Sequence, residues 1–314
     1  MKKRRVFLSF PEVGGSGTEL LKTQKVIEGV NIRFSCETTS TYGIVSSGTI
    51  DVYNLNRNDT EFLTTSTSFW LNRQRLVQLY AGYDDDVRML MSGQILEAPP
   101  SGYPDMSLHI RLYGNAKWSS EVIDIKKSDL KIVDLIDYVG RVTGYAVNMP
   151  DWLRRNNMWL NKKLDEYSYT GTPMDLLNKI QDMVGGYNPN EDSFVVGVQN
   201  GEIIVGSPSK SEENNVLLVS KETGMIGLPM PTYNGIDVKM LLNPDVKVND
   251  VIKLESERVG MCNGYYYVIK IRHEGELRSN QFYTTLTCAR NPTFINKSIV
   301  ESQGNTNGQE QIEL

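Results

Sequence analysis

Histidine and cysteine are scarce in this chain, which contains two histidines and three cysteines. A zinc site needs closely spaced ligands, and His109 and His273 are too isolated to supply them. Cys36, Cys262 and Cys288 are widely separated and stand in strand-like surroundings. We therefore expect reduced, buried cysteines that act as small apolar residues, and no cofactor. Only a carboxylate-bound calcium ion is left open by the composition.

Long apolar runs are also missing. No stretch of about 18 consecutive apolar residues occurs, so we expect no membrane-spanning segment. The basic start, Met1 to Arg5, is followed only by Val6 to Phe10 before Pro11, which is too short for a secretory signal. With 314 residues, 39% hydrophobic and 23% charged, the chain fits a cytosolic protein with two or three cores.

An excess of positive charge is absent as well. The formal net charge is −5 and the isoelectric point is about 5.3. Strong binding to nucleic acid requires clustered Lys and Arg that neutralise phosphates, and this composition argues against it. A mildly acidic wall would instead let DNA slide past without sticking.

The first part of the chain, residues 1–118, consists mostly of predicted strands. Residues 31–36 alternate polar and apolar, which places Ile32, Phe34 and Cys36 on one face, as is typical of a half-buried strand. Such strands predict a small β-barrel, which would remove exposed sheet edges. Further strands are expected at residues 5–10, 48–53, 75–82, 87–96 and 106–113, with a hairpin tip at residues 83–86 and a short helix at residues 58–65.

Between residues 119 and 208 the apolar period becomes helical. Ser128 is a candidate N-cap for a helix that ends at Gly144, and Thr172-Pro173 open a second helix that ends at Gly185-Gly186. The order β-α-β-β-α-β-β predicts a compact α+β insert. Its strands are expected at residues 145–149, 165–170, 193–199 and 202–205, the last two joined by a type I′ turn at Asn200-Gly201.

The end of the chain returns to strand patterns. Residues 209–215 are polar and turn-rich and predict a linker, and residues 216–292 predict a second β-barrel. Residues 293–314 are poor in apolar side chains and are expected to form a flexible C-terminal tail. The predicted fold class is therefore α+β and mainly β, with two small β-barrel domains of the tube type flanking an α+β insert.

Catalytic patterns are weak throughout. Gly14 to Thr18 lacks the lysine of a phosphate-binding loop, and Asp84-Asp85-Asp86 has the spacing of a solvated turn rather than of a calcium loop. His109 lies on the polar face of a predicted strand. His273 and Glu274 are adjacent in a strand, so they point to opposite faces and are poorly placed to cooperate. We expect no catalytic residues and no enzyme.

Three consecutive tyrosines, Tyr265, Tyr266 and Tyr267, are the candidate contact residues. Alternation sends Tyr266 to one face of a strand and its two neighbours to the other, so at least one hydroxyl should meet a polar partner or another chain. Tyrosine suits interfaces that are dry on one side and wet on the other. We interpret the three as a subunit or partner interface, with ordinary aromatic packing as an alternative of equal weight.

Two stretches, residues 48–55 and 235–274, resemble baseplate hub proteins of contractile-tailed bacteriophages, the Mu-like hub and late-control protein D-like family. In the second stretch a Leu-Leu-Asn-Pro step follows the first strand, and a Tyr-rich strand precedes a His-bearing one. The resemblance covers nearly the whole chain. It implies a structural virion protein, a homotrimer in which two barrels per subunit surround a channel. Such a hub would join the distal end of the tail tube to the cell-puncturing spike and nucleate baseplate assembly.

The resemblance also implies partners and a location. The partners would be a tail tube or tube-end protein, the spike protein and baseplate wedge proteins, with DNA only passing through the channel. The chain would reside in the tail baseplate of the virion, and in the host cytoplasm during assembly. Because the insert resembles small ring-building domains of secretins, a secretion-system or envelope ring component is an alternative. A cell-wall-binding or cell-wall-degrading enzyme is a third, opposed by the lack of a recognisable carboxylate pair or zinc set.

Overall fold

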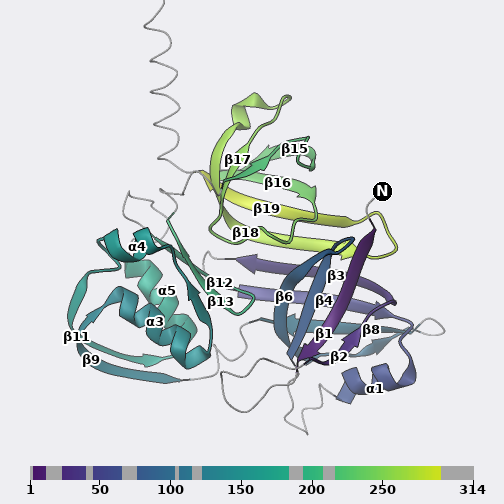
Figure 1. Ribbon diagram of the computed structural model, residues 1–314, viewed down its shortest axis with the longest axis horizontal. Helices are drawn as coiled ribbons and strands as arrows, with labels where there is room; N and C mark the ends of the chain where they lie inside the picture. The colour runs from purple at the N-terminus through teal and green to yellow at the C-terminus, as the bar shows by residue number, and fades with distance from the viewer. Residues whose placement is uncertain are drawn as a thin grey trace, which may run out of the picture.

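Strands from the two ends of the chain lie side by side in the computed structural model (Figure 1). The structure describes residues 3–11, 23–39, 45–65, 76–102, 106–114, 122–183, 194–207 and 216–290. Apolar residues at every second position build the strands of the first part, because each strand buries one face. Its elements are β1 (Arg4–Pro11), β2 (Thr23–Ile27), β3 (Asn31–Thr39), β4 (Val45–Tyr53), α1 (Arg57–Thr65), β5 (Leu76–Tyr83), β6 (Asp86–Glu97), β7 (Pro100–Ser101) and β8 (Ser107–Tyr113).

The last part of the chain is also built from strands. Pro231 ends β15, and Asn243-Pro244 follow β16. Its elements are β14 (Leu217–Val219), β15 (Met225–Pro231), β16 (Gly235–Leu241), β17 (Val251–Leu254), the short 3-10 helix η3 (Gly260–Cys262), β18 (Gly264–Glu276) and β19 (Phe282–Arg290).

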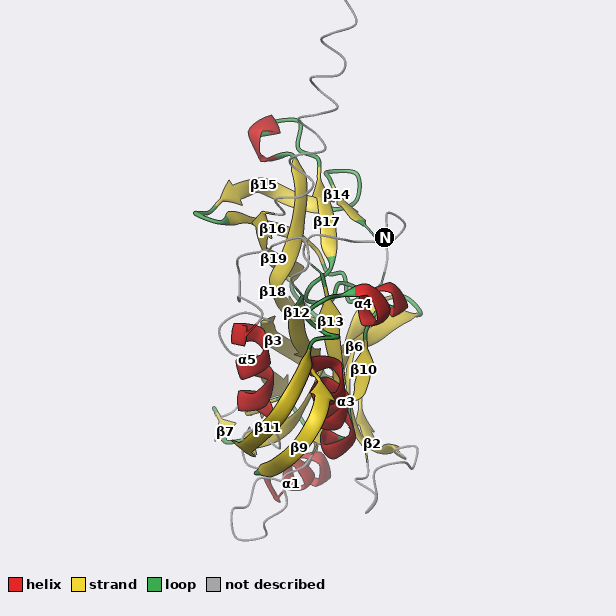
Figure 2. Cartoon of the chain, turned by 90° about the vertical axis from the view of Figure 1, so that its left-hand side faces the viewer, coloured by secondary structure: helices red, strands yellow, loops and turns green. Residues whose placement is uncertain are grey.

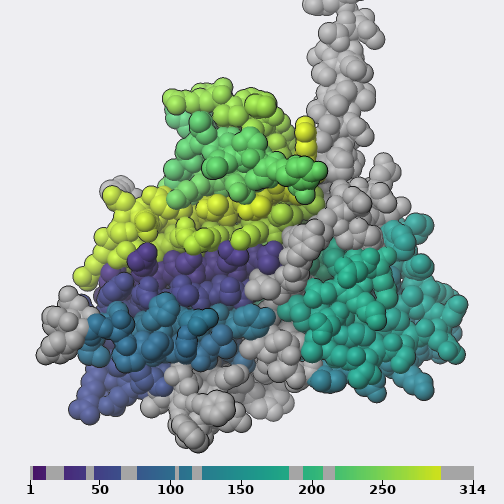
Figure 3. All heavy atoms as spheres, turned by 180° about the vertical axis from the view of Figure 1, so that it is seen from behind, coloured from purple at the N-terminus to yellow at the C-terminus, as the bar shows by residue number. Residues whose placement is uncertain are grey.

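One 14-stranded sheet contains all of these strands. Its main path is β15-β16-β19-β18-β3-β4-β8-β6-β5-β1-β2, and β7, β14 and β17 pair beside it. The two parts meet where β18 pairs antiparallel with β3, from Lys270 opposite Thr39 to Glu276 opposite Arg33. In Figure 3 these strands form adjoining bands, yellow-green for β18 and purple for β3. We call this pairing the β3–β18 junction.

Strand β18 changes its neighbour along its length. Residues 264–267 pair with β17, whereas residues 270–276 pair with β3, and β19 pairs along the opposite edge. Phe282, at the start of β19, packs in the core of the first part, while Ile271 of β18 packs in the core of the last part. Strand β19 therefore contributes to both cores, since its Leu286 and Cys288 pack in the core of the last part.

The mainly β, α+β class predicted from the sequence is confirmed. The expected helix near residues 58–65 is present as α1, and Asp84 at the predicted hairpin tip has a left-handed φ of 52°. Two closed barrels are not seen in the part of the chain that the structure describes, because hydrogen bonding continues from one strand-rich part into the other. Three predicted segments lie outside the described residues: the loop Gly14 to Thr18, the linker and the tail. The division into domains stays a prediction.

The insert contains helices between two small sheets. Figure 2 shows the ribbon of β9 and β11 in front of helices α3 and α5. The second sheet has the order β10-β13-β12. The predicted order of elements is observed, with the extra helix α4 between the second and third strands. The elements are β9 (Ile123–Lys131), α3 (Ile132–Thr143), β10 (Ala146–Asn148), α4 (Asp151–Asn156), β11 (Lys163–Gly171), α5 (Pro173–Met183), β12 (Val195–Gln199) and β13 (Glu202–Gly206).

The predicted start of the first insert helix at Ser128 is wrong. Ser128 lies within β9, which keeps pairing with β11 as far as Lys131. Helix α3 starts at Ile132 instead, where the Asp134 carboxylate accepts the Lys131 N–H at 2.9 Å. The predicted end is confirmed, because Gly144 adopts a left-handed φ of 73° at the C-cap.

The predicted cap at Thr172 is confirmed. Its hydroxyl accepts the Asp175 N–H at 3.1 Å and donates to the Asp175 carboxylate at 2.8 Å. We expect Thr172→Ala to lower the free energy of unfolding by about 1 kcal/mol, because two N-terminal groups of α5 lose their partner. Thr170→Ala, on the exposed side of the neighbouring strand, should change it by less than about 0.5 kcal/mol. Equal effects in chemical denaturation would contradict the capping role.

The β12–β13 hairpin connects the insert to both strand-rich parts. Its turn residues Asn200 and Gly201 have φ values of 54° and 86°, as the predicted type I′ turn requires. The Asn200 side-chain amide donates to the Met89 carbonyl at 3.1 Å, and Gln199 accepts the Val248 N–H at 3.1 Å. None of the described helices is long and apolar enough to cross a membrane.

Candidate functional site

One face of the large sheet is polar, while the opposite face is buried. In β3, Ile32, Phe34 and Cys36 are at most 4% exposed, and the residues between them point the other way. The same alternation continues through β16, β19, β18, β4 and β8. We call the outward residues the polar sheet face: Asp237, Lys239, Leu241, Tyr283, Thr285, Thr287, Lys270, Arg272, Glu274, Glu276, Arg33, Ser35, Glu37, Ser47, Thr49, Asp51, Tyr53, Ser107, His109, Arg111 and Tyr113.

Several charges on this face form ion pairs. Half-exposed pairs of this kind contribute only about 0–1 kcal/mol each to stability, so their main effect is on the surface potential. The Lys239 ammonium also lies over the Tyr283 ring, 4.2 Å from its centre. The ion pairs are Lys270–Glu37 at 2.8 Å, Arg272–Glu274 at 2.6 Å, and Arg111 with Glu97 at the end of β6 at 2.7 Å. His109 Nδ1 lies 2.6 Å from an Asp51 carboxylate oxygen.

A shallow groove of about 390 Å³ crosses the polar sheet face. It runs between Arg272 on β18 and Tyr113 on β8, and Ser35, Ser47 and Thr49 form part of its floor. Figure 3 shows the strands of this face as bands from yellow-green through purple to blue. Hydroxyls and paired charges along the groove favour water and offer no apolar pocket for a small ligand.

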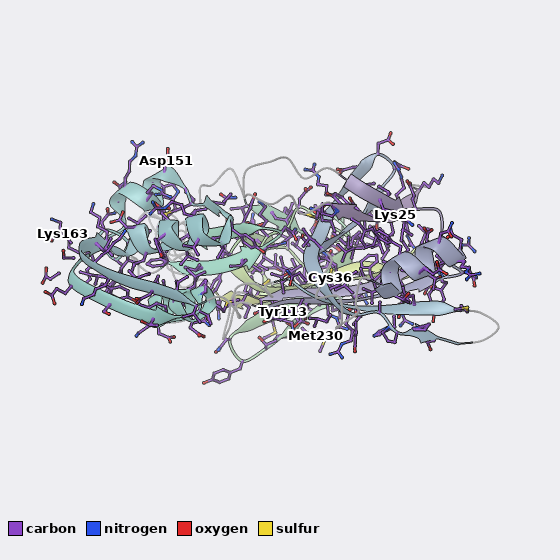
Figure 4. The ribbon with its side chains drawn as sticks, turned by 90° about the horizontal axis from the view of Figure 1, so that it is seen from below. Lys25, Cys36, Tyr113, Asp151, Lys163 and Met230 are labelled. Atoms are coloured by element: carbon purple, nitrogen blue, oxygen red, sulfur yellow. The ribbon has the colours of Figure 1, made fainter. Side chains whose placement is uncertain are left out.

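Exposed apolar residues flank the polar sheet face on both sides. On the β15–β16 hairpin, Met230 is 67% exposed and Tyr233 is fully exposed. Beyond β8, Leu96 and Met106 are 47% and 45% exposed. Figure 4 shows Met230 and Tyr113 toward the same side of the molecule, away from Lys25. Strand β15 is also the end of the sheet path, and apolar residues beside an open strand edge favour contacts with another chain.

The three predicted contact tyrosines are placed mostly inside the subunit. Tyr266 and Tyr267 are 5% and 3% exposed, and the Tyr266 hydroxyl donates to the Cys262 carbonyl at 2.7 Å. Tyr265 is partly exposed. Their role in a subunit or partner interface stays a prediction. Of the three, Tyr265 is the most accessible to a partner. The exposed residues of β15 were missed, although its apolar run without alternation was a usable signal.

The two histidines are in different surroundings. His109 lies on the polar sheet face beside Asp51, as its strand position predicted. His273 is 3% exposed, with Nδ1 2.9 Å from the Thr284 hydroxyl and no hydrogen-bond partner at Nε2 among the described residues. Burial lowers the pKa of His273 to about 4. Glu274 points to the opposite face and pairs with Arg272, so the predicted separation of His273 from Glu274 is confirmed.

The three cysteines are free and buried, as predicted. Burial raises the pKa of Cys36 to about 12, so its thiol stays protonated and unreactive at neutral pH. Within the described ranges no three His, Cys, Asp or Glu side chains are grouped closely enough to hold a metal ion.

Solved structures of phage tail proteins have a similar fold. The 43 kDa tail protein of prophage MuSo2 from Shewanella oneidensis matches with a TM-score of 0.59 at 8% identity, covering 94% of this chain and 98% of that protein. The tail protein from Neisseria meningitidis MC58 matches with a TM-score of 0.59 at 7% identity, covering 93% and 98%. The E. coli c3393 protein, a type VI secretion component, matches with a TM-score of 0.53 at 9% identity, covering 85% and 75%.

The fold is therefore that of phage tail proteins and their secretion-system counterparts. The family described as baseplate hub gp41 matches residues 13–288, which is most of the chain. The chain belongs to this family. Among curated proteins, none matches it by sequence. Family membership implies a structural component of the phage baseplate, with a place in the virion tail.

Proposed function

We propose that the chain is the subunit of a homotrimeric hub in a contractile-tail baseplate. The continuous sheet supports this proposal, because it joins two strand-rich parts of one chain into a single wall with one polar face. Three copies around an axis would place six strand-rich units around a channel and match a threefold spike to a sixfold tube. In this arrangement the polar sheet face lines the channel, where water and passing DNA require a hydrophilic surface.

The proposed hub joins the distal end of the tail tube to the cell-puncturing spike. Its partners are the tail tube or tube-end protein, the spike protein and the baseplate wedge proteins, and it nucleates baseplate assembly in the host cytoplasm. The exposed apolar residues Met230, Tyr233, Leu96 and Met106 offer contact area for these partners or for another subunit. The proposed role is structural and non-enzymatic.

Light scattering of the purified chain tests the trimer. We expect a mass of about three times 35.5 kDa. Met230→Ser and Tyr233→Ser together should shift the mass toward the monomer if the β15–β16 hairpin is a subunit contact. Met261→Ser, at the exposed side chain on η3, serves as the matched control. A stable wild-type monomer that cleaves peptidoglycan would contradict the hub.

A secretion-system component is the second candidate. The similarity in fold to the E. coli type VI secretion component supports it. The neighbouring genes separate the two candidates, because a hub gene should lie beside genes for tape-measure, spike and wedge proteins. No contact within the described residues supports the third candidate, a cell-wall-binding or cell-wall-degrading enzyme.

A further inference from the structure

We propose that Tyr233 of one copy of the chain inserts into a groove beside β15 of the next copy. This inference rests on the proposed function, because it names the contact that joins neighbouring subunits of the hub. Tyr233 lies at the tip of the β15–β16 hairpin, which projects from the side of the molecule in Figure 2. Its side chain is fully exposed, so its ring does not pack against the described residues of its own copy. Exposed aromatic side chains mark contact surfaces, and tyrosines contribute strongly to interfaces.

The hairpin tip holds this ring in a defined position. The Thr232 N–H donates to the Gly235 carbonyl at 2.9 Å, and the Arg290 N–H donates to the Asn234 carbonyl at 2.9 Å. A side chain at Gly235 would collide with the backbone of β19, so the hairpin lies tightly against that strand. A preorganised tip loses little conformational entropy on binding, which favours Tyr233 as the anchor of an interface.

A groove of about 320 Å³ lies beside the first half of β15, and we call it the β15 groove. Met225 and Leu228 form its apolar part. Strand β15 bulges between Ile226 and Met230, where Gly227 adopts a left-handed φ of 75° and Leu228 is 51% exposed. A thioether and a branched side chain suit an aromatic ring, because sulfur and aromatic rings attract each other and the apolar area leaves water.

Two hydrogen-bonded turns form the walls of the β15 groove. In the first, the Ser220 N–H donates to the Thr223 hydroxyl at 2.8 Å. In the second, the Ser256 N–H donates to the Asn263 side-chain oxygen at 2.7 Å. The groove is therefore formed before any partner arrives, as the tyrosine tip is.

The charges around the β15 groove favour an uncharged occupant. Its rim carries two cations and three carboxylates: Lys221, Arg258, Glu222, Glu255 and Glu257. Glu255 pairs with Lys253 at 2.7 Å, so the remaining rim charges are two of each sign. The hairpin segment from residue 224 to residue 236 contains no charged side chain, which matches this balance. The exposed guanidinium of Arg258 can stack on a tyrosine ring that enters the groove.

The tyrosine and the groove of one copy lie apart, so the contact has to join different copies. Strand β15 has the groove beside its first half and Tyr233 just beyond its end, and its seven residues span roughly 20 Å. Two different patches that fit each other produce a head-to-tail contact, which closes into a ring when the rotation between copies permits. In a threefold ring every tyrosine and every groove is used.

Two complementary variants of the purified full-length chain test the contact by light scattering. Tyr233→Ser keeps the groove, whereas Leu228→Glu keeps the tyrosine but places a charge in the groove. We expect each variant alone to be a monomer. An equimolar mixture should reach about two times 35.5 kDa, because one contact forms and the ring cannot close. Met261→Ser, at a side chain that is 86% exposed on η3, is the control and should keep the wild-type mass.

Cross-linking locates the contact directly. The three native cysteines are buried, so a short bismaleimide cross-linker should react with introduced thiols. We expect Tyr233→Cys combined with Leu228→Cys to give covalent multimers on a denaturing gel. Tyr233→Cys combined with Met261→Cys is the matched control and should give far fewer.

The outcomes separate this contact from the trimer itself. A wild-type trimer that keeps its mass in both variants and gives no cross-link above the control would overturn the contact and leave the hub in place. A wild-type monomer without cross-links at high concentration would overturn both. Cross-links from a chain that is otherwise monomeric would support the contact and contradict only the stable trimer. Circular dichroism verifies folding, and Leu228→Ser replaces Leu228→Glu if the latter does not fold.

Discussion

Phe282→Ala is expected to lower the free energy of unfolding by about 3–5 kcal/mol, as is usual when a buried aromatic ring is removed from a core. Phe282 has no exposed surface and packs edge-on against Phe34 and Tyr83, with ring centres 5.9 and 5.3 Å away. The Arg4 guanidinium lies over the same ring at 5.2 Å. One side chain from the last part of the chain thus fills the core of the first part.

Denaturant unfolding followed by circular dichroism measures this loss. The matched control is Phe194→Ala, which removes an equally buried ring from the core of the insert. Hydrogen exchange should then separate the two variants. Phe282→Ala should expose amides of β3 and β18, whereas Phe194→Ala should expose those of β12 and α5. A loss below about 1 kcal/mol, or unchanged protection in β3, would show that the β3–β18 junction does not depend on this ring.

Burial of His273 by itself is expected to remove about 3 kcal/mol of stability on acidification. Burial lowers the pKa of His273 in the folded chain to about 4, below its ordinary value of 6.5. The unfolded chain therefore binds the proton more readily between these values. This contribution to stability is fully present above pH 6.5 and is lost as the pH falls through about 4.

Asp250 acts in the opposite direction. Its carboxylate accepts the Lys247 N–H at 2.7 Å, but burial raises its pKa to about 6 from an ordinary 3.8. The folded chain therefore binds this proton more readily, and the associated stability, about 3 kcal/mol, is present below pH 3.8 and lost as the pH rises through about 6. Between pH 4 and 6 the two groups largely cancel.

Single variants should reveal each contribution. Asp250→Asn should raise the free energy of unfolding at pH 8 by up to about 3 kcal/mol. The stability of this variant should then fall steeply as the pH drops from about 6.5 to 4, because only His273 titrates. His273→Gln should reverse the slope, so that stability increases from pH 6 toward 4. Denaturant unfolding at half-unit pH steps measures both slopes. If both variants keep the wild-type slope, neither group controls the acid response.

Local elements were predictable from the sequence because their causes are local. The alternation of Ile32, Phe34 and Cys36 identified β3, since a strand that buries one face repeats every two residues. Thr172 and Gly144 identified helix ends through groups that satisfy the terminal backbone. Ser128 misled the prediction because it lies in strand β9, where pairing with β11 satisfies the backbone that a helix N-cap would otherwise satisfy.

The shared sheet could not be predicted in the same way. The Thr39 hydroxyl donates to the carbonyl of Ile269, which lies 230 residues later in the sequence. No periodic pattern encodes a partner at that separation. The ion pairs Lys270–Glu37 and Arg111–Glu97 likewise join different strands, so their residues are unremarkable until the strands are paired. For the tyrosines, alternation correctly separated the two faces, but it did not show that both faces are covered at Tyr266 and Tyr267.

The β3–β18 junction has a consequence for synthesis on the ribosome. At about 5–20 residues per second, roughly 10 to 50 seconds separate the appearance of β3 from that of its partner. During this time the edge of β3 is unpaired and liable to join the edges of other chains. A product truncated before β18 keeps that edge permanently open. We expect such truncated chains to aggregate more readily than the full-length chain.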